Sequence, residues 1–407
     1  MSSFAGLTSF RTRYTKFSQA IISPHRLRGL LECLCVNPSN CRGSNMPNRI
    51  FNFSAGPCTL PLSALEKAQT DFVDYQGAGM SLIEMSHRGK HYDEVHYEAM
   101  ANIREVLNVP ESHDVLLIQG GATLQFAMVP MNLMADGKTA EFIITGTWVK
   151  KAIADAEKIG PTRIIWTGET ENFTRIPAGE EYTVGNDAAY VHICGNETIG
   201  GIEYHAYPNS GGVPLVADMS SHIMSRPIEW SKLQLAFAGA QKNLGPAGLA
   251  LVVIHKDLLE KCKDGLPAYL SYKTHAGKDS RYNTPPVFSI YMMKLTLDWV
   301  KSAGGLAEME KRAIARSSAL YNTIDSLDGW YRCPADKESR SRMNVCFRLP
   351  TEELEARFIA EALEENFSGL KGHSSVGGCR ASMYNAMPVE GAERLAEFMV
   401  KFKKKNA

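Results

Sequence analysis

The 407-residue sequence lacks the features that mark several large classes of protein. Neither charge is in excess, because 44 Lys and Arg residues balance 44 Asp and Glu residues. The overall field therefore gives no reason to expect nucleic acid or an anionic membrane surface as a partner. No apolar run approaches the roughly 20 residues that cross a bilayer, so we expect a soluble protein. Any anionic ligand must be bound by a local site.

Cysteine is too irregularly spaced for a disulfide framework or a zinc site. The nine cysteines are an odd number in a long chain, and only Cys33 and Cys35 stand as a close pair. We expect reduced thiols and no bound metal.

Acidic residues are absent before Glu32, whereas arginine, lysine and serine are frequent there. This composition of residues 1–45 is typical of a transit peptide for an organelle, either plastid or mitochondrion. The alternative is a disordered extension that carries no targeting signal. In that case translation could also start at Met46, and the protein would be cytoplasmic. Globular patterning begins at Ile50.

From Ile50 onward the apolar pattern predicts an α/β protein. Helical spacing is clear in 62–75 and 91–107, and short apolar runs then alternate with helical stretches. The runs are Val115–Ile118, Phe142–Ile144, Ile164–Trp166, Tyr190–Ile193, Val213–Ala217, Leu235–Phe237 and Leu249–Ile254. Such alternation predicts a mainly parallel, seven-stranded sheet between helices.

The last quarter of the chain changes character. A long helix is expected over Leu295–Leu327, broken near Gly304–Gly305, followed by strand, helix, strand and helix up to Lys405. We therefore expect a large domain at 62–305 and a smaller α/β domain at 306–407. Residues 46–61 are expected to pack with the small domain.

Two polar residues follow apolar runs at the place where open α/β sheets bind their ligands. Lys242 lies between a run of small apolar residues and a Gly/Pro-rich turn, where desolvation lowers the pKa of an amine and lets it form a Schiff base. Asp218 ends another run, where a carboxylate can pair with the pyridine nitrogen of pyridoxal phosphate. The ordinary alternatives are a surface lysine and a helix N-cap.

Three further segments fit an anionic cofactor and substrate. The turn Gln119-Gly-Gly-Ala-Thr-Leu-Gln125 has glycines and a hydroxyl ahead of a helix, which suits a phosphate, although such a turn is often only structural. Arg88 and Arg380 adjoin glycines, and guanidinium groups bind carboxylates and phosphates in a bidentate manner. Each arginine alone could equally be a surface residue.

Together these residues resemble the phosphoserine aminotransferases, a family of fold-type-I pyridoxal enzymes. The resemblance runs from about Ile50 to the C-terminus and rests on several long motifs in the family's order. They include Phe51-Asn-Phe-Ser-Ala-Gly-Pro57, Ser86-His-Arg-Gly89, Asn196-Glu-Thr-Ile199, Ala240-Gln-Lys-Asn-Leu-Gly-Pro-Ala-Gly248, Tyr282-Asn-Thr-Pro-Pro286, Ser341-Arg-Met-Asn344 and Tyr384-Asn-Ala386.

The resemblance implies a role for each candidate residue. Lys242 would form the Schiff base with pyridoxal 5′-phosphate, and Asp218 would contact its ring nitrogen. The other cofactor contacts would be Ala122, Thr123, Trp148, Thr198 and Gln241, joined by Asn283 and Thr284 from the second subunit of a homodimer. The substrate would be held by His87, Arg88, His373 and Arg380.

The reaction implied by the resemblance is the reversible transfer of an amino group between glutamate and 3-phosphohydroxypyruvate. Its products are O-phospho-L-serine and 2-oxoglutarate, a step of L-serine biosynthesis, and 4-phosphohydroxythreonine is a further candidate substrate. The chain departs from many relatives at Ser374 and from some at Thr123, where an arginine stands in those proteins. Each change removes a charge directed at phosphate.

Two other functions compete with this interpretation. One is another class-V pyridoxal enzyme, such as an alanine–glyoxylate aminotransferase or a cysteine desulfurase, but no cysteine lies in a recognisable mobile loop. The other is a catalytically silent binding protein on the same scaffold, against which Lys242, Asp218 and Trp148 all argue.

Overall fold

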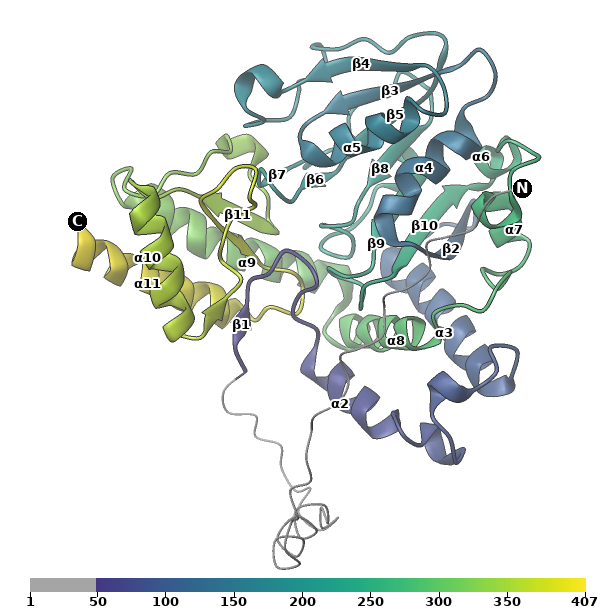
Figure 1. Cartoon of the computed structure of the whole chain (residues 1–407), viewed down its shortest axis with the longest axis horizontal. Helices are drawn as coiled ribbons and strands as arrows, with labels where there is room; N and C mark the ends of the chain where they lie inside the picture. The colour runs from purple at the N-terminus through teal and green to yellow at the C-terminus, as the bar shows by residue number, and fades with distance from the viewer. Residues whose placement is uncertain (1–48) are drawn as a thin grey trace, which may run out of the picture. The chain divides into compact units, whose positions relative to one another are not determined.

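A seven-stranded sheet lies at the centre of the computed structural model, which describes residues 49–407 (Figure 1). Its strands are β2 (His113–Gln119), β3 (Thr139–Ile144), β4 (Thr162–Thr167), β5 (Ala188–Cys194), β8 (Leu215–Asp218), β9 (Leu235–Gly239) and β10 (Leu249–His255). Six of them contain one of the apolar runs singled out in the sequence, and β8 overlaps the seventh, Val213–Ala217, from Leu215 onward, so the prediction of a seven-stranded sheet is confirmed.

The strand order is β2-β10-β9-β8-β5-β3-β4. The pairs from β9 through to β4 are parallel, while β10 runs antiparallel to both of its neighbours. The sheet is therefore mainly parallel with one reversed strand. The carboxyl ends of the other six strands meet along one edge.

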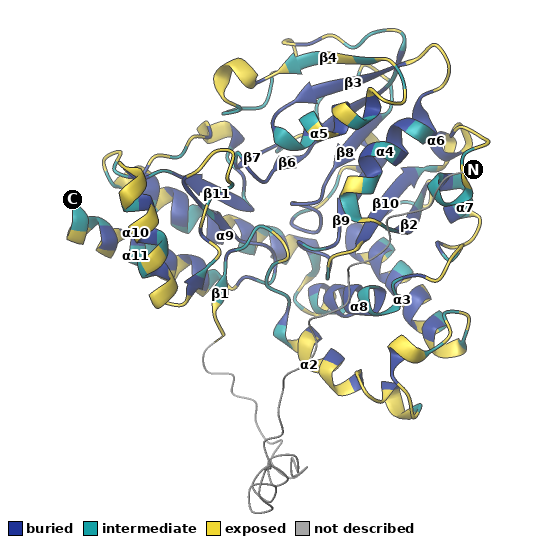
Figure 2. Cartoon of the chain, in the orientation of Figure 1, coloured by how far each residue is buried: buried dark blue, intermediate teal, exposed yellow. Residues whose placement is uncertain are grey.

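Helices cover both faces of the sheet, and Figure 2 shows the strands between them as largely buried. On β2, Val115 and Leu117 belong to the core under α3 (Lys90–Leu107) and α8 (Val287–Ser302). Leu116 and Ile118 point the other way, into the core under α4 (Gly121–Leu133) and α5 (Thr147–Ala156). This alternation follows from the two-residue period of a strand, and it explains why strands covered on both faces read as continuous apolar runs.

Short helices and strands complete this part of the chain. They are α2 (Leu62–Asp71), α6 (Lys256–Glu260), α7 (Tyr272–Ala276), the small antiparallel pair β6 (Asn196–Glu197) and β7 (Ile202–Glu203), and the 3-10 helices η2 (Tyr75–Gly77), η3 (Leu82–Glu84), η4 (Glu169–Glu171), η5 (Trp230–Lys232) and η6 (Ala268–Leu270).

A separate hydrophobic core forms around the C-terminal segments. Its elements are α9 (Gly305–Ser326), β11 (Asn344–Phe347), α10 (Glu352–Glu364), β12 (Phe367–Ser368), β13 (Cys379–Ser382) and α11 (Val389–Asn406). The N-terminal strand β1 (Phe51–Asn52) pairs in parallel with β12, and Phe53 is fully buried in this core. Residues 50–407 nevertheless form one compact unit by their contacts, so the two-domain boundary at 305/306 stays a prediction.

The sequence placed two helix boundaries wrongly. The first helix ends at Asp71 rather than Tyr75, and α8 begins at Val287, eight residues before the expected start at Leu295. Pro285 and Pro286 precede Val287, and proline is well suited to a position before or at the start of a helix. The early turns of α8 are buried on several sides, which hides the one-sided periodicity that marks a surface helix.

The predicted transit peptide falls outside the described residues. Within residues 49–407, no helix is long and apolar enough to cross a membrane. The six cysteines of this range are free thiols.

Candidate active site

A cavity of about 640 Å³ opens where the carboxyl ends of the parallel strands meet. Nine of the candidate residues line it, namely Ala122, Thr123, Trp148, Thr198, Asp218, Gln241, Lys242, His373 and Arg380. They come from positions up to 258 residues apart, between Ala122 and Arg380, yet each follows a strand or belongs to one. The topology of the sheet therefore brings them together.

The Lys242 side chain is held inside this cavity. Lys242 follows β9 by three residues, is 8% exposed, and donates from Nζ to Thr198 Oγ1 at 2.8 Å. Burial lowers the pKa of its amine, against the opposing influence of Asp218 and of other acidic neighbours. A lysine in these surroundings carries less of its charge and is a better nucleophile.

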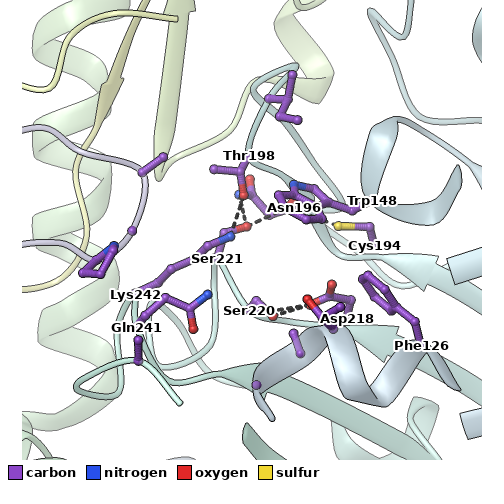
Figure 3. Close-up of a pocket in the computed structure, with 18 of the residues that line it drawn as sticks. Phe126, Trp148, Cys194, Asn196, Thr198, Asp218, Ser220, Ser221, Gln241 and Lys242 are labelled. Carbon is purple, nitrogen blue, oxygen red and sulfur yellow. Dashed lines mark hydrogen bonds between the residues drawn. The ribbon is translucent and has the colours of Figure 1, made fainter. Parts of the chain in front are cut away.

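The carboxylate of Asp218 stands at the end of β8 in the same cavity (Figure 3). Its Oδ1 accepts hydrogen bonds from the backbone amide and the hydroxyl of Ser220, at 2.9 and 2.6 Å. No donor among the described residues reaches Oδ2. Burial raises the pKa of Asp218, so a cationic group placed against Oδ2 would stabilise the ionised form.

The turn between β2 and α4 is shaped to hold an anion. Gly120 has φ +97°, and a Cβ there would lie 2.7 and 2.8 Å from two side-chain atoms of Leu124, so glycine is required. Gly121, Ala122 and Thr123 form the first turn of α4, whose N–H groups lack partners within the helix. The helix dipole favours negative charge at this end.

Trp148 provides the aromatic wall of the cavity. It lies in the first turn of α5, with its ring centroid 5.6 Å from Lys242 Nζ. Its Nε1 is buried and has no hydrogen-bond partner within the described part of the chain. A planar ring lying between Trp148 and Asp218 would therefore meet an indole on one side and a carboxylate at its edge.

Arg380 and His373 line the side of the cavity formed by the C-terminal segments. Arg380 donates from Nη1 to the backbone oxygen of Thr198 at 3.2 Å, its buried Nε has no partner, and no described carboxylate pairs with it. His373 Nδ1 accepts from the Ser375 amide at 3.2 Å. With Nδ1 as an acceptor, Nε2 is the ring nitrogen that carries a proton and can donate. Both groups are available to an anion.

Four candidate residues do not line the cavity of their own chain. Asn283 and Thr284 are exposed in the segment before α8. His87 is half-buried and Arg88 is exposed in the loop between η3 and α3. A ligand in this cavity therefore meets none of these four side chains among the lining residues of the same chain.

Several cavity residues escaped the sequence analysis as site residues. Ser220 orients Asp218, Asn196 and Ser221 are joined by a hydrogen bond of 2.6 Å, and Phe126 and Cys194 contribute apolar surface. Asn196 belongs to a motif that the sequence does show, and Ser220 follows Asp218 by two residues, a spacing at which a hydroxyl commonly bonds a carboxylate. Phe126 and Cys194 look like ordinary core residues.

Comparison with known proteins decides the family. The family model described as "Aminotransferase class-V" matches residues 50–395. The chain belongs to the class-V aminotransferases. A phosphoserine aminotransferase of Geobacillus kaustophilus is 50% identical over 359 residues, covering 88% of this chain and 99% of that protein. Phosphoserine aminotransferase 1, chloroplastic, of Arabidopsis thaliana is 48% identical, over 88% of this chain and 84% of that protein.

Solved structures of class-V aminotransferases agree. The phosphoserine aminotransferase from Bacillus circulans subsp. alkalophilus superposes with a TM-score of 0.86 at 47% identity, over 88% of this chain and 99% of that one. The enzyme from Trichomonas vaginalis, described as bound to pyridoxal phosphate, gives 0.83 at 38% identity, over 86% and 100%. An alanine–glyoxylate aminotransferase from Nostoc sp. gives 0.67 at 17% identity, which shows a common fold only.

Class-V aminotransferases use pyridoxal phosphate, and the cavity fits this cofactor. The free N-terminal turn of α4 suits its phosphate, the open Oδ2 of Asp218 suits its ring nitrogen, and Lys242 suits its aldehyde.

Proposed function

We propose that this class-V aminotransferase moves an amino group between glutamate and 3-phosphohydroxypyruvate, giving O-phospho-L-serine and 2-oxoglutarate for L-serine biosynthesis. The observation that carries the proposal is the pairing, in one cavity, of the cofactor residues with the unpaired guanidinium group of Arg380 and the donor face of His373. A doubly anionic amino acid needs two such cationic or donor groups. The relatives' names point to the same substrate class.

The residues divide the chemical work. Pyridoxal phosphate, when bound, supplies an electron sink for the negative charge that develops at the substrate's α-carbon. Asp218 keeps a proton on the ring nitrogen, and Trp148 holds the ring's orientation. Lys242 attaches the cofactor and, as a free amine, carries a proton to and from the α-carbon. Thr198 positions Lys242 through the bond to Nζ.

Substrate binding is assigned to the anion-binding side of the cavity. Arg380 binds the α-carboxylate through its guanidinium fork, since no carboxylate among residues 49–407 pairs with it and its Nε has no partner in this range. His373 lies beside it and donates from Nε2 to the substrate phosphate. His87 and Arg88 bind the same phosphate, from the loop between η3 and α3 of whichever subunit brings that loop to the cavity.

The alternatives are disfavoured by the thiols and by the intact cofactor residues. Of the described cysteines, Cys194 lines the cavity, and burial raises its pKa well above the usual value. A protonated, buried thiol is a poor nucleophile, which argues against a desulfurase. A catalytically silent binding protein would have no need of a buried lysine whose amine is held by a hydrogen bond to Thr198.

The decisive experiment is a coupled assay of the purified protein with glutamate and 3-phosphohydroxypyruvate, run beside alanine with glyoxylate and beside free cysteine. We expect rapid 2-oxoglutarate formation in the first reaction only. Comparable turnover with alanine and glyoxylate, or sulfide release from cysteine, would replace the proposal with one of its rivals. A folded protein that holds its cofactor and turns over none of them would support the silent scaffold.

The proposal includes a homodimer with shared sites. Asn283 and Thr284 are exposed and do not line their own cavity, whereas the resemblance gives them to the cofactor phosphate. We propose that they complete the cavity of a partner subunit. We also propose domains at 62–305 and 306–407, and import into an organelle directed by residues 1–45, as the name of the Arabidopsis relative suggests.

A further inference from the structure

Glu197 carries a buried carboxyl group at the edge of the site. It is 1% exposed, ends the two-residue strand β6, and precedes Thr198, the partner of Lys242. No described lysine, arginine or histidine forms an ion pair with it, and its Oε1 has no hydrogen-bond partner in this range. A buried acid without a cation is costly, so its position calls for a reason.

The carboxyl group of Glu197 lies against the N-terminus of α5. Its Oε2 accepts from the Trp148 amide at 3.5 Å. Gly146, the N-cap of α5, offers no side chain of its own, and a Cβ there would lie 2.5, 2.7 and 2.9 Å from the three carboxyl atoms. The acid therefore occupies the space in which a capping side chain would otherwise stand.

We propose that Glu197 is a positioning residue that caps α5 from outside the helix and so fixes the ring of Trp148 in the cavity. The first N–H groups of a helix lack internal partners, and the dipole favours an anionic acceptor there. Trp148 is in that first turn, so a shift of the cap moves the ring directly. The inference rests on the proposed function only in taking Trp148 as the cofactor's wall.

The charge of this cap depends on its neighbours. The titratable groups that interact with it are Asp218 on β8, Lys242 after β9, Cys194 on β5 and Tyr204 after β7. Burial raises the pKa of Glu197 to about 8, while the amide of Trp148 and the ammonium group of Lys242 act in the opposite sense. The cap therefore gains its charge around pH 8.

The test observes the ring of Trp148 directly, by fluorine NMR of the protein without its cofactor. All five tryptophans are labelled with 5-fluorotryptophan, and Trp148→Phe assigns one fluorine resonance. In the wild type we expect this resonance to move with a midpoint near pH 8. Glu197→Gln should displace it and abolish the midpoint.

The matched control is Glu203→Gln. Glu203 lies on β7, the strand paired with β6, is also 1% exposed, and accepts from the Arg342 amide at 2.9 Å. Because the partners of Glu203 are Arg342 and Arg226 rather than the first turn of α5, its variant should leave the Trp148 resonance in place. Equal effects of the two variants, or five resonances that move together, would assign Glu197 a general structural role and overturn the proposal.

A rescue experiment distinguishes a capping role of Glu197 from a role in packing alone. In Glu197→Ala the space beside Gly146 is empty, and Gly146 has an extended backbone, φ 169°, that serine can adopt. The double variant Gly146→Ser/Glu197→Ala therefore supplies a cap from within the chain. We expect cofactor affinity about fivefold weaker in Glu197→Ala, as the loss of one cap predicts, and recovered in the double variant. No recovery of the affinity or of the resonance would refute the capping role.

Discussion

Active-site sharing can be tested by combining two damaged chains in one dimer. One chain carries Lys242→Ala, and the other carries Asn283→Ala with Thr284→Ala. In a closed two-fold dimer, each site would use Lys242 from one subunit and the Asn283/Thr284 pair from the other. One site of the mixed dimer then collects every lesion, and the other site is wholly wild type.

The expected recovery follows from this geometry. Lys242 is buried in its own cavity, whereas Asn283 and Thr284 are exposed and lie outside it. A purified mixed dimer should have about half the activity of the wild type, since one of its two sites is intact. An unsorted mixture with random pairing should have about a quarter, because about half of the dimers are mixed.

The two chains should be expressed together with different affinity tags, purified over both, and assayed with glutamate and 3-phosphohydroxypyruvate. Dimers of Lys242→Ala chains that carry both tags are the matched control, and they should stay inactive. If the mixed dimer is as inactive as its parents, although mass analysis finds both chains, then Asn283 and Thr284 act within their own subunit.

Four other outcomes are expected. Lys242→Ala should abolish turnover and leave a folded protein by circular dichroism; substantial residual transamination would refute its assignment. Because burial lowers the pKa of Lys242, the cofactor-free wild type should gain stability as pH rises from that lowered pKa to the ordinary lysine value of 10.5. Urea unfolding should show this rise, and Lys242→Met should lack it. Arg380→Lys should weaken glutamate and phosphoserine alike, whereas Arg88→Lys should raise KM for phosphoserine more, since lysine cannot form a bidentate fork. Equal losses in both variants would contradict that division. Ser374→Arg should lower KM for the phosphorylated substrate, because its neighbour His373 lines the cavity; an unchanged or higher KM would place the phosphate elsewhere.

The sequence predicted the sheet well because its strands are covered on both faces. Leu116 and Val115 face opposite cores, and both are apolar, so the run is conspicuous. The direction of a strand cannot be predicted in this way, since an apolar run has the same pattern in a parallel and in an antiparallel strand. The reversal of β10 depends on the short turn that contains Lys242, which returns the chain beside β9. Two-residue strands such as β1 and β12 are too short for any periodicity.

The candidate site was predicted in part, for a physical reason. Lys242 and Asp218 were recognised because a charged residue at the end of an apolar run is unusual. Glu197 was quoted only as part of a motif, since its burial depends on Gly146, which is 51 positions earlier in the sequence. Whether Asn283 acts in a partner subunit is a property of an assembly, which no single-chain pattern contains.

The pairing of β1 with β12 limits when and where the chain can be processed. Phe51 and Asn52 find their strand partners at Phe367 and Ser368, so this end of the protein cannot complete its structure until nearly all of the chain has been synthesised. If the N-terminal segment is removed as proposed, the cut must fall before Phe51, because a later cut would remove a strand and, with Phe53, a fully buried ring of the C-terminal core.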